Sequence, residues 1–200
     1  MKIKSLIIAF VLLLGFQAHA QNSGLFQVTY NMATPMGDTK DFTGDYSWRG
    51  FNIGGRWFVN ENLSWGLNFG WNIFDQKVTG TAQIENGAAT GTQIRYLNSW
   101  PIMINTHYYF GSKYTFRPYV GLNAGTYYIY ERLDFGIYTI DRDNWHFGLA
   151  PELGFTYPVS ESLLLVNLQY NYAFASGTSI GGSAKAFSYI GINVGFAFQY

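Results

Sequence analysis

The chain alternates apolar and polar residues with a period of two along most of its length. At the C-terminal end, the even-numbered residues from Ile190 to Tyr200 are apolar or aromatic, and the odd-numbered residues between them are Gly, Asn, Ala or Gln. Successive side chains of a β-strand point to opposite faces, so this pattern predicts a strand with one apolar face. Similar segments bring the total to about eight strands. They lie near 26–32, 51–59, 63–73, 94–110, 117–128, 145–155 and 166–172.

The connections between these strands alternate between short and long. Short turns at one end and long extracellular loops at the other are typical of outer-membrane barrels, and this arrangement would leave both termini in the periplasm. Nearly every charged residue lies in or beside a connection, whereas a soluble β-sandwich would also carry charges along its exposed strand faces. The short polar turns lie at 60–62, 111–114 and 160–162, and the longer segments, rich in Gly, Thr, Ser and charge, lie near 34–45, 75–93, 131–143 and 175–185.

The composition places these strands in a membrane. The chain has 20% aromatic and only 12% charged residues, against about 25% charged residues in a typical soluble protein. No stretch after Ala20 is apolar for about 18 residues, which excludes a transmembrane helix there. Only helices and closed barrels satisfy every backbone hydrogen bond in hydrocarbon. We therefore predict an all-β fold: one closed antiparallel transmembrane β-barrel of about eight strands, connected as an up-and-down meander.

The first 20 residues have the pattern of an export signal. Lys2 and Lys4 precede an unbroken apolar run from Leu6 to Phe16, and the small-x-small sequence at 18–20 follows. The run is shorter than the about 20 residues that a helix needs to cross a bilayer. We predict a cleaved signal peptide at 1–20 and an outer-membrane barrel at 21–200, with a retained anchor as the alternative. The chain has no Cys, so export implies neither a disulfide nor a lipid-modified cysteine.

Aromatic residues gather near the strand ends, where rings with a polar edge prefer the level of the lipid headgroups. We expect two aromatic girdles. Pro101 lies inside the fourth strand and has no N–H for the ladder, so we expect a bulge or kink there. The girdle on the long-loop side would contain Tyr46, Trp48, Trp71, Tyr96, Trp100, Tyr130 and Trp145, and the one on the short-turn side Trp57, Trp65, Tyr108, Phe110, Tyr119, Tyr157 and Tyr200.

Four ionisable residues are turned towards the lumen by the period-two pattern. Arg56, His107 and Arg117 lie near the short-turn end, and Glu152 lies nearer the middle. An unpaired buried charge is expensive, so these groups are expected to pair. The simplest interpretation is an ionic plug that fixes the strand register, and a path for ions or protons is the alternative.

Metal, cofactor and nucleic-acid binding have little support. Without the predicted signal, ten basic residues stand against twelve acidic ones, which argues against nucleic-acid binding. His107 and His146 are then the only histidines, and the pattern places them towards opposite ends of the lumen. With no Cys and no close His/Glu spacing, we predict neither a metal nor another cofactor.

An enzymatic Ser-His-acid site is the third hypothesis of function. His146 lies near the outer rim, with Asp141 and Asp143 upstream and Ser176 and Ser179 on another loop. These residue types are able to build a nucleophile and a base. Nothing in their spacing brings them together, and Ser and Asp are ordinary turn residues, so we expect no enzyme.

The chain resembles the small outer-membrane β-barrel proteins, the group that includes OmpX-like and OmpW-like barrels. The resemblance covers the predicted mature chain through short motifs. It implies a Gram-negative outer-membrane location and insertion by the barrel-assembly machinery, with an insertion signal of Phe196, Phe198 and Tyr200 in the last strand. The motifs are MGDTKDF at 36–42, RGFNI at 49–53, NLSWGL at 62–67, PYVGL at 118–122 and GFAFQY at 195–200.

The sequence favours a non-enzymatic integral outer-membrane protein with a structural or surface-interaction role. An interior of about eight strands is just wide enough to be filled by side chains, which argues against a general-diffusion pore. The expected partners are the membrane lipids and an extracellular ligand held by the loops. The alternative, which the OmpW-like resemblance implies, is a narrow channel for small and apolar solutes.

Overall fold

The computed structural model describes residues 24–84, 87–113, 115–175, 180 and 186–200. The predicted signal peptide and its cleavage site, as well as Ser176 and Ser179, lie outside the described residues. Within the described part of the chain, no helix is long and apolar enough to cross a membrane.

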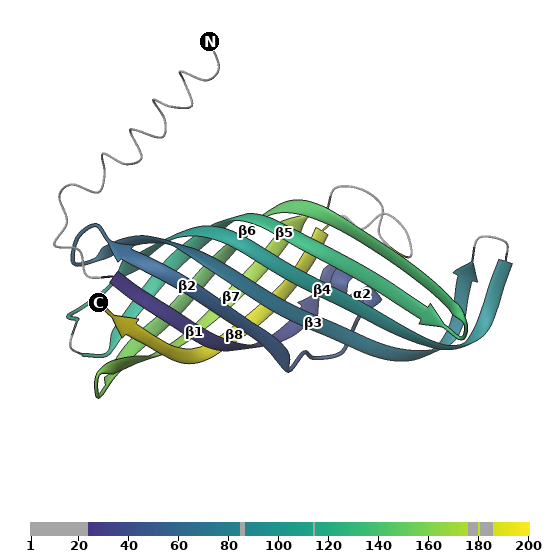
Figure 1. The fold of residues 1–200 in the computed structure, drawn as a ribbon, viewed down its shortest axis with the longest axis horizontal. Helices are drawn as coiled ribbons and strands as arrows, with labels where there is room; N and C mark the ends of the chain where they lie inside the picture. Colours follow the sequence, from purple (N-terminus) through teal and green to yellow (C-terminus); the bar gives the residue numbers. More distant parts are fainter. Residues whose placement is uncertain (1–23, 85–86, 114, 176–179, 181–185) are drawn as a thin grey trace, which may run out of the picture.

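Eight antiparallel strands of the described chain form a closed barrel, each paired with its neighbours in sequence, and β8 closes on β1 (Figure 1). The predicted all-β barrel with an up-and-down order is confirmed. The strands are β1 (Gly24–Met36), β2 (Arg49–Phe58), β3 (Leu63–Ile84), β4 (Gly87–Tyr109), β5 (Arg117–Phe135), β6 (Tyr138–Val159), β7 (Ser162–Phe174) and β8 (Ala186–Gln199), and a short helix, α2 (Gly37–Phe42), follows β1.

The strands are staggered as well as closed. Followed from partner to partner once around the barrel, the pairing that starts at Phe26 on β1 returns to β1 at Met36, ten residues further on. Such a stagger requires the strands to tilt by roughly 35–45° from the barrel axis. We call the end with both chain termini and the β2–β3, β4–β5 and β6–β7 turns the turn end, and the opposite end the loop end (Figure 1).

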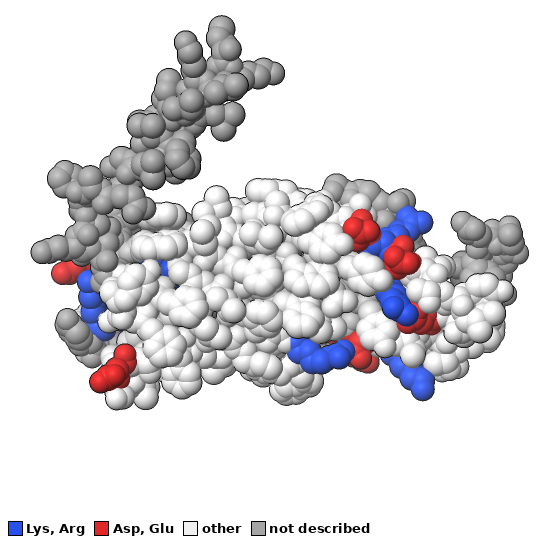
Figure 2. Space-filling view, viewed as in Figure 1, with Lys and Arg blue, Asp and Glu red and all other residues white. Residues whose placement is uncertain are grey.

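The outer surface of the barrel is an apolar band. Figure 2 shows charged side chains near the two ends of the barrel and an uncharged middle, which is the arrangement that a hydrocarbon environment requires. Near the loop end, aromatic side chains at outward positions form one row across four strands. The rings of Trp71 and Trp100 stack, and Tyr128 contacts both Trp100 and Trp145, with centroid distances of 5.4 and 5.2 Å. One predicted girdle residue, Tyr119, is misplaced and is discussed with the lumen.

Of the expected bulge or kink at Pro101, the bulge is wrong. The β3–β4 pairing keeps the same register on both sides of Pro101, from Phe69 opposite Ile102 to Asn72 opposite Ser99. Gly70 lies at the matching position of β3, and a Cβ there would come within 2.9 Å of the Pro101 ring. Because Gly70 has no side chain, there is room for the proline ring. The β3–β4 ladder therefore lacks hydrogen bonds at Pro101, but neither strand has the extra residue that would make a bulge.

Two of the predicted long loops are strand instead. β3 and β4 pair as far as Ile84 and Gly87, and β5 and β6 pair as far as Phe135 and Tyr138. The neighbouring pairings end earlier, since β2 reaches β3 only up to Ile73 and β7 reaches β6 only from position 148. The parts of β3–β6 beyond these points extend past the barrel wall (Figure 1). We call the portions of these parts that lie beyond the aromatic row the projecting sheet, and they comprise residues 74–84, 87–98, 130–135 and 138–143.

Candidate functional site

The lumen of the turn half contains a buried ion pair. Arg56 on β2 and Glu152 on β6 are predicted to point inward, and the structure places Arg56 Nη2 2.9 Å from Glu152 Oε1 with both side chains almost fully buried. His107 on β4 joins them, with Nε2 3.4 Å from the same oxygen, which is longer than a good N–H···O hydrogen bond. Three of the four predicted lumen residues therefore meet at one point.

Neutral donors complete the shell of the Glu152 carboxylate. The hydroxyl of Tyr119 donates to Oε1 at 2.8 Å, and the amide of Asn167 donates to the same atom at 3.1 Å. Asn123 donates to Oε2 at 3.0 Å. A buried carboxylate is tolerated when its lone pairs are satisfied in this way, and removing the cation partner leaves an uncompensated charge.

The fourth predicted residue, Arg117, lies apart from this cluster. Its guanidinium stacks over the rings of Phe58 and Tyr109, with its Cζ atom 5.5 and 4.7 Å from the ring centroids. It also donates to the backbone carbonyl of Glu61 in the β2–β3 turn. Arg117 thus closes the lumen at the turn end and is not a partner of Glu152.

Large side chains fill the cross-section around the ion pair. Arg56, Tyr109 and Tyr119 are each about 1% exposed, and Arg56 Nη1 donates to the Tyr109 hydroxyl at 2.7 Å. The Arg56 guanidinium also lies over the Tyr119 ring, with its Cζ atom 4.7 Å from the ring centroid. They belong to a turn-half cluster of buried side chains. Its apolar and aromatic members are Leu25, Phe58, Tyr109, Tyr119, Leu163, Leu165 and Ala197.

The inward position of Tyr119 corrects the predicted girdle. The sequence does indicate this position, because residues two apart on a strand face the same side. Tyr119 is two residues from the inward Arg117, and Tyr109 is two residues from the inward His107. Both tyrosines are missing from the predicted site. An aromatic residue near a strand end is typical of a girdle, but the parity of these two residues points inward.

A layer of asparagines spans the middle of the lumen. Asn193 donates to Asn167 at 2.6 Å and accepts from Asn31 and Asn52 at 2.6 and 2.5 Å. Because Asn167 also donates to Glu152, one hydrogen-bonded network joins the ion pair to the opposite wall of the barrel. Satisfied networks of this kind fix the register of the strands that carry them.

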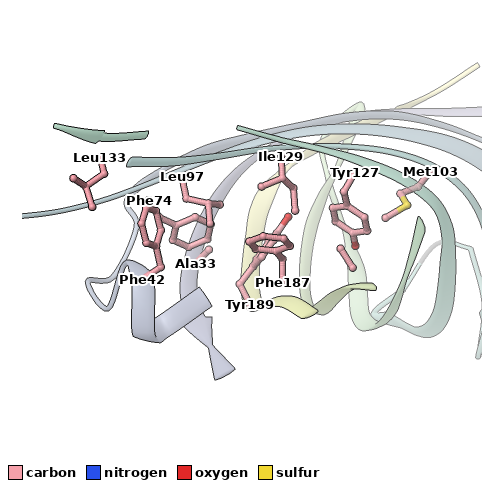
Figure 3. Packing of buried hydrophobic residues seen from close by; sticks show 11 residues of the cluster. Ala33, Phe42, Phe74, Leu97, Met103, Tyr127, Ile129, Leu133, Phe187 and Tyr189 are labelled. Carbon is pink, nitrogen blue, oxygen red and sulfur yellow. The ribbon is translucent and has the colours of Figure 1, made fainter. Parts of the chain in front are cut away.

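The loop half of the lumen holds a cluster of buried apolar side chains with polar ones among them, which include Gln93, Ser99, Glu131, His146 and Asn171. The apolar side chains form a second cluster, which Figure 3 shows beside α2. Phe42 on α2 points into this cluster towards Phe74, and the Ser188 N–H donates to Thr39 Oγ1 at 2.8 Å. Arg95 donates to the Phe42 carbonyl at 3.2 Å, so α2 is held inside the mouth. The buried members of this loop-half cluster are Ala33, Phe42, Phe74, Leu97, Met103, Tyr127, Ile129, Leu133, Ala173, Phe187 and Tyr189.

Of the residues weighed for catalysis, His146 and Asp143 lie on different faces of the barrel wall, and Ser176 and Ser179 are outside the described residues. His146 points inward, where it is buried with its ring 5.1 Å from that of Phe187. Asp143 is exposed on the outer face, where it accepts from Tyr128 at 3.0 Å. Among the residues that the structure describes, no group of three or more His, Asp or Glu is placed to hold a metal ion.

The projecting sheet carries exposed charge in pairs. Arg49 at its base pairs with Asp75, and Arg132 donates to both carboxylate oxygens of Asp134 at 2.8 and 3.0 Å. These hydrogen bonds from Arg132, with one from Thr139 at 2.7 Å, hold the pKa of Asp134 below its ordinary value. Asp134 lies beyond the aromatic row, in the projecting sheet.

A small closed barrel with an apolar outer band and a filled lumen defines an integral membrane protein. The sequence profile described as the outer membrane protein beta-barrel domain matches residues 6–198, and the chain belongs to this family. The outer membrane and its lipids are therefore its environment.

Solved structures with the same fold share little sequence identity with this chain. Neisserial surface protein A shares 14% identity over 90% of this chain and 98% of its own, with a TM-score of 0.57. Ail, the attachment invasion locus protein of Yersinia pestis, shares 11% over 90% and 100%, with a TM-score of 0.51. A major outer membrane protein from Thermus thermophilus shares 12% over 91% and 100%, with a TM-score of 0.51. At these identities the likeness concerns the fold. No curated protein matches the sequence.

Proposed function

We propose that this chain is a non-enzymatic surface-interaction protein whose barrel is a closed scaffold and whose projecting sheet meets a ligand outside the cell. The observation that carries the proposal is the filled lumen. The ion pair of Arg56 and Glu152, with Tyr109 and Tyr119 packed around it, occupies the turn half, and α2 enters the mouth of the loop half. With the interior used for packing, the projecting sheet is the part of the described chain that extends beyond the membrane.

The ionic cluster acts in this proposal as a plug that fixes register. Arg56, Glu152 and Asn167 come from β2, β6 and β7, so their contacts hold together strands that are not all neighbours. Such a constraint is useful because a slip of one residue would turn every apolar side chain of a strand to the wrong face.

The proposal also includes orientation and assembly. The turn end with both termini faces the periplasm after removal of residues 1–20, and the loop end faces outward. Short turns inside and long extensions outside are the usual arrangement in such barrels. Phe196, Phe198 and Tyr200 are exposed on the outer face of the barrel at its C-terminal end. There they would be accessible to the barrel-assembly machinery as an insertion signal.

Surface labelling of intact cells tests this proposal. Because the chain has no Cys, Thr79→Cys provides a single thiol in the projecting sheet, and Glu161→Cys provides a matched thiol in the β6–β7 turn. A membrane-impermeant maleimide is expected to label position 79 in intact cells and position 161 only after the outer membrane is opened. The reverse pattern would overturn the surface role.

A narrow channel for apolar solutes is the second candidate, favoured by the loop-half cluster. A lumen lined by residues such as Phe74, Leu97 and Ile129 offers an apolar solute a compatible surface. This role needs α2 to leave the mouth and a path past the ion pair. Conductance through the protein separates the two candidates.

A further inference from the structure

The outer face of the projecting sheet has a hollow across β4 and β5, just beyond the aromatic row. Its volume is about 290 Å³, close to the lower limit of roughly 300 Å³ for sites that take small molecules. In the β4–β5 ladder, Asn98 lies opposite Tyr130 and Tyr96 lies opposite Arg132. The hollow therefore spans two successive pairs of outward residues and is sized for one small ring. Its lining residues are Tyr96, Asn98, Tyr130, Arg132 and Asp134.

The lining combines aromatic rings with charged and amide groups. Arg132 donates from Nε to both carboxylate oxygens of Asp134, at 2.8 and 3.0 Å, which fixes the two side chains against each other. The Nη groups of Arg132 carry further N–H donors, the carboxylate accepts, and the Asn98 amide does both. A saccharide ring matches this set, because its hydroxyls donate and accept hydrogen bonds while its C–H face packs against an aromatic ring.

The charges around the hollow argue against an anionic ligand. Asp141 lies opposite Arg132 on β6, and Asp75, which pairs with Arg49, lies opposite Tyr96 on β3. A phosphate group would approach these carboxylates as well as Arg132, and like charges repel. A neutral polyol meets no such cost. The charged residues on this face of the described strands are Asp75, Asp134, Asp141 and Asp143, against Arg49, Lys77 and Arg132.

The height of the hollow indicates where its ligand comes from. On β4, Asn98 and Tyr96 lie two and four residues beyond Trp100 of the aromatic row. At about 3.3 Å per residue and a tilt of about 40°, they stand about 5–10 Å above the row. Trp and Tyr rings of such a row lie at the headgroup level, and the headgroup layer is about 5–7 Å thick on each side. The hollow therefore lies at the outer part of that layer.

We propose that this hollow binds the saccharide headgroup of a glycolipid in the outer leaflet of the protein's own membrane. The sugar ring packs against Tyr96 and Tyr130, and its hydroxyls exchange hydrogen bonds with Asn98, Arg132 and Asp134. The inference rests on the proposed function, since it needs the loop end to face outward, and it adds a ligand class for one face of the projecting sheet.

Lipid retention by the full barrel tests the site. The barrel is refolded into phosphatidylcholine nanodiscs with equal amounts of a glycolipid and phosphatidic acid, and native mass spectrometry counts the lipids that stay bound. Galactosyl, glucosyl and glucosaminyl diacylglycerol are used in turn. With at least one of them, the wild type is expected to retain about tenfold more glycolipid than phosphatidic acid, because hydrogen bonds to charged groups distinguish the two headgroups.

A matched pair of double variants assigns this retention to the hollow. Tyr96→Ala with Asp134→Ala removes a ring and a carboxylate from the lining and is expected to reduce glycolipid retention about tenfold. Tyr108→Ala with Glu161→Ala removes an exposed ring on the same strand and an exposed carboxylate, both at the turn end, and is expected to retain as much as the wild type. Asp134→Asn keeps the shape of the lining and is expected to lose about threefold. Circular dichroism checks that each variant is folded.

The remaining outcomes decide between ligands and between sources. Retention of phosphatidic acid equal to that of every glycolipid, or equal losses in both double variants, would overturn the saccharide site. Methyl glycosides of the same sugars are added to discs without glycolipid, and a glycoside that binds while its glycolipid is not retained would overturn the lipid source. Surface labelling at position 79 is independent of these results, so failure of the hollow and failure of the surface role are distinguishable.

Discussion

The two halves of the lumen differ in their proportions of charged and apolar side chains. In the turn half, Arg56 and Glu152 are buried as charges, and each depends on partners at hydrogen-bond distance. In the loop half, Phe42, Phe74 and Phe187 fill the lumen by apolar packing. Phe42 is carried by α2, whereas the other two belong to strands of the barrel wall. In the turn half, loss of one member of the ion pair is expected to destabilise the protein strongly, because the other charge stays buried without its partner. In the loop half, the loss of stability is expected to scale with the side-chain volume removed.

The largest effect is expected from breaking the ion pair on one side. Glu152→Gln leaves the Arg56 guanidinium buried without a counter-charge and is expected to lower the free energy of unfolding by about 4 kcal/mol. Urea unfolding in lipid vesicles, followed by tryptophan fluorescence, measures the change. The control is Arg56→Met with Glu152→Leu, which removes both charges and is expected to lose less than the single variant. An unchanged stability in Glu152→Gln would count against the plug.

Removal of the Phe42 ring is expected to have the next largest effect. Phe42→Ala takes the apolar anchor of α2 out of the loop-half cluster and is expected to lower the free energy of unfolding by about 3 kcal/mol. Proteolysis within 37–42 is expected to become faster, since α2 loses its only large buried apolar side chain. The matched control is Phe116→Ala, an exposed ring at the turn end. Equal losses in both variants would contradict the inward packing of α2.

The asparagine layer is expected to give a smaller change. Asn193→Ala leaves Asn31, Asn52 and Asn167 without their common partner, and unsatisfied buried amides cost about 1–3 kcal/mol in total. The same unfolding assay measures it. Asn98→Ala, at an outward position on β4, provides the comparison, and a loss no larger than in that variant would show that the network contributes no register constraint.

The smallest effect is expected at the exposed Arg132–Asp134 pair. Its hydrogen bonds lower the pKa of Asp134 in the folded state, so the stabilisation is present above the ordinary aspartate pKa and is lost as the pH falls through the folded value. Carbon NMR of the Asp134 carboxyl is expected to show a low titration midpoint that rises towards normal in Arg132→Ala. A midpoint that is the same in both proteins would contradict the pair.

Most of what could be predicted from the sequence came from the alternation of inward and outward side chains along each strand. Alternation alone put Arg56, His107 and Glu152 inside, because the side-chain period of a strand is fixed at two. It could not say that Arg56 meets Glu152 while Arg117 does not, since that depends on a ten-residue stagger summed over eight pairings.

The errors came from segments without a local signal. MGDTKDF at 36–42 is polar apart from its ends, which predicts part of an external loop, yet Phe42 packs against residues from β3 and β4 that are far away in sequence. The weakly charged segment around Thr79 also resembles a loop. It forms a hairpin because β3 and β4 continue their ladder, and cross-strand threonine pairs accompany the pairing.

Single-channel recording of the refolded barrel in a planar bilayer tests most directly whether both halves of the lumen are closed. We predict that the wild type is silent, and that Phe42→Ala is also silent because the turn-half cluster still blocks the path. Openings are expected only when Phe42→Ala is combined with substitutions that remove side-chain volume from the turn half, such as Arg56→Ala with Tyr119→Ala. Discrete openings in the wild type would contradict the closed lumen and place the narrow channel first.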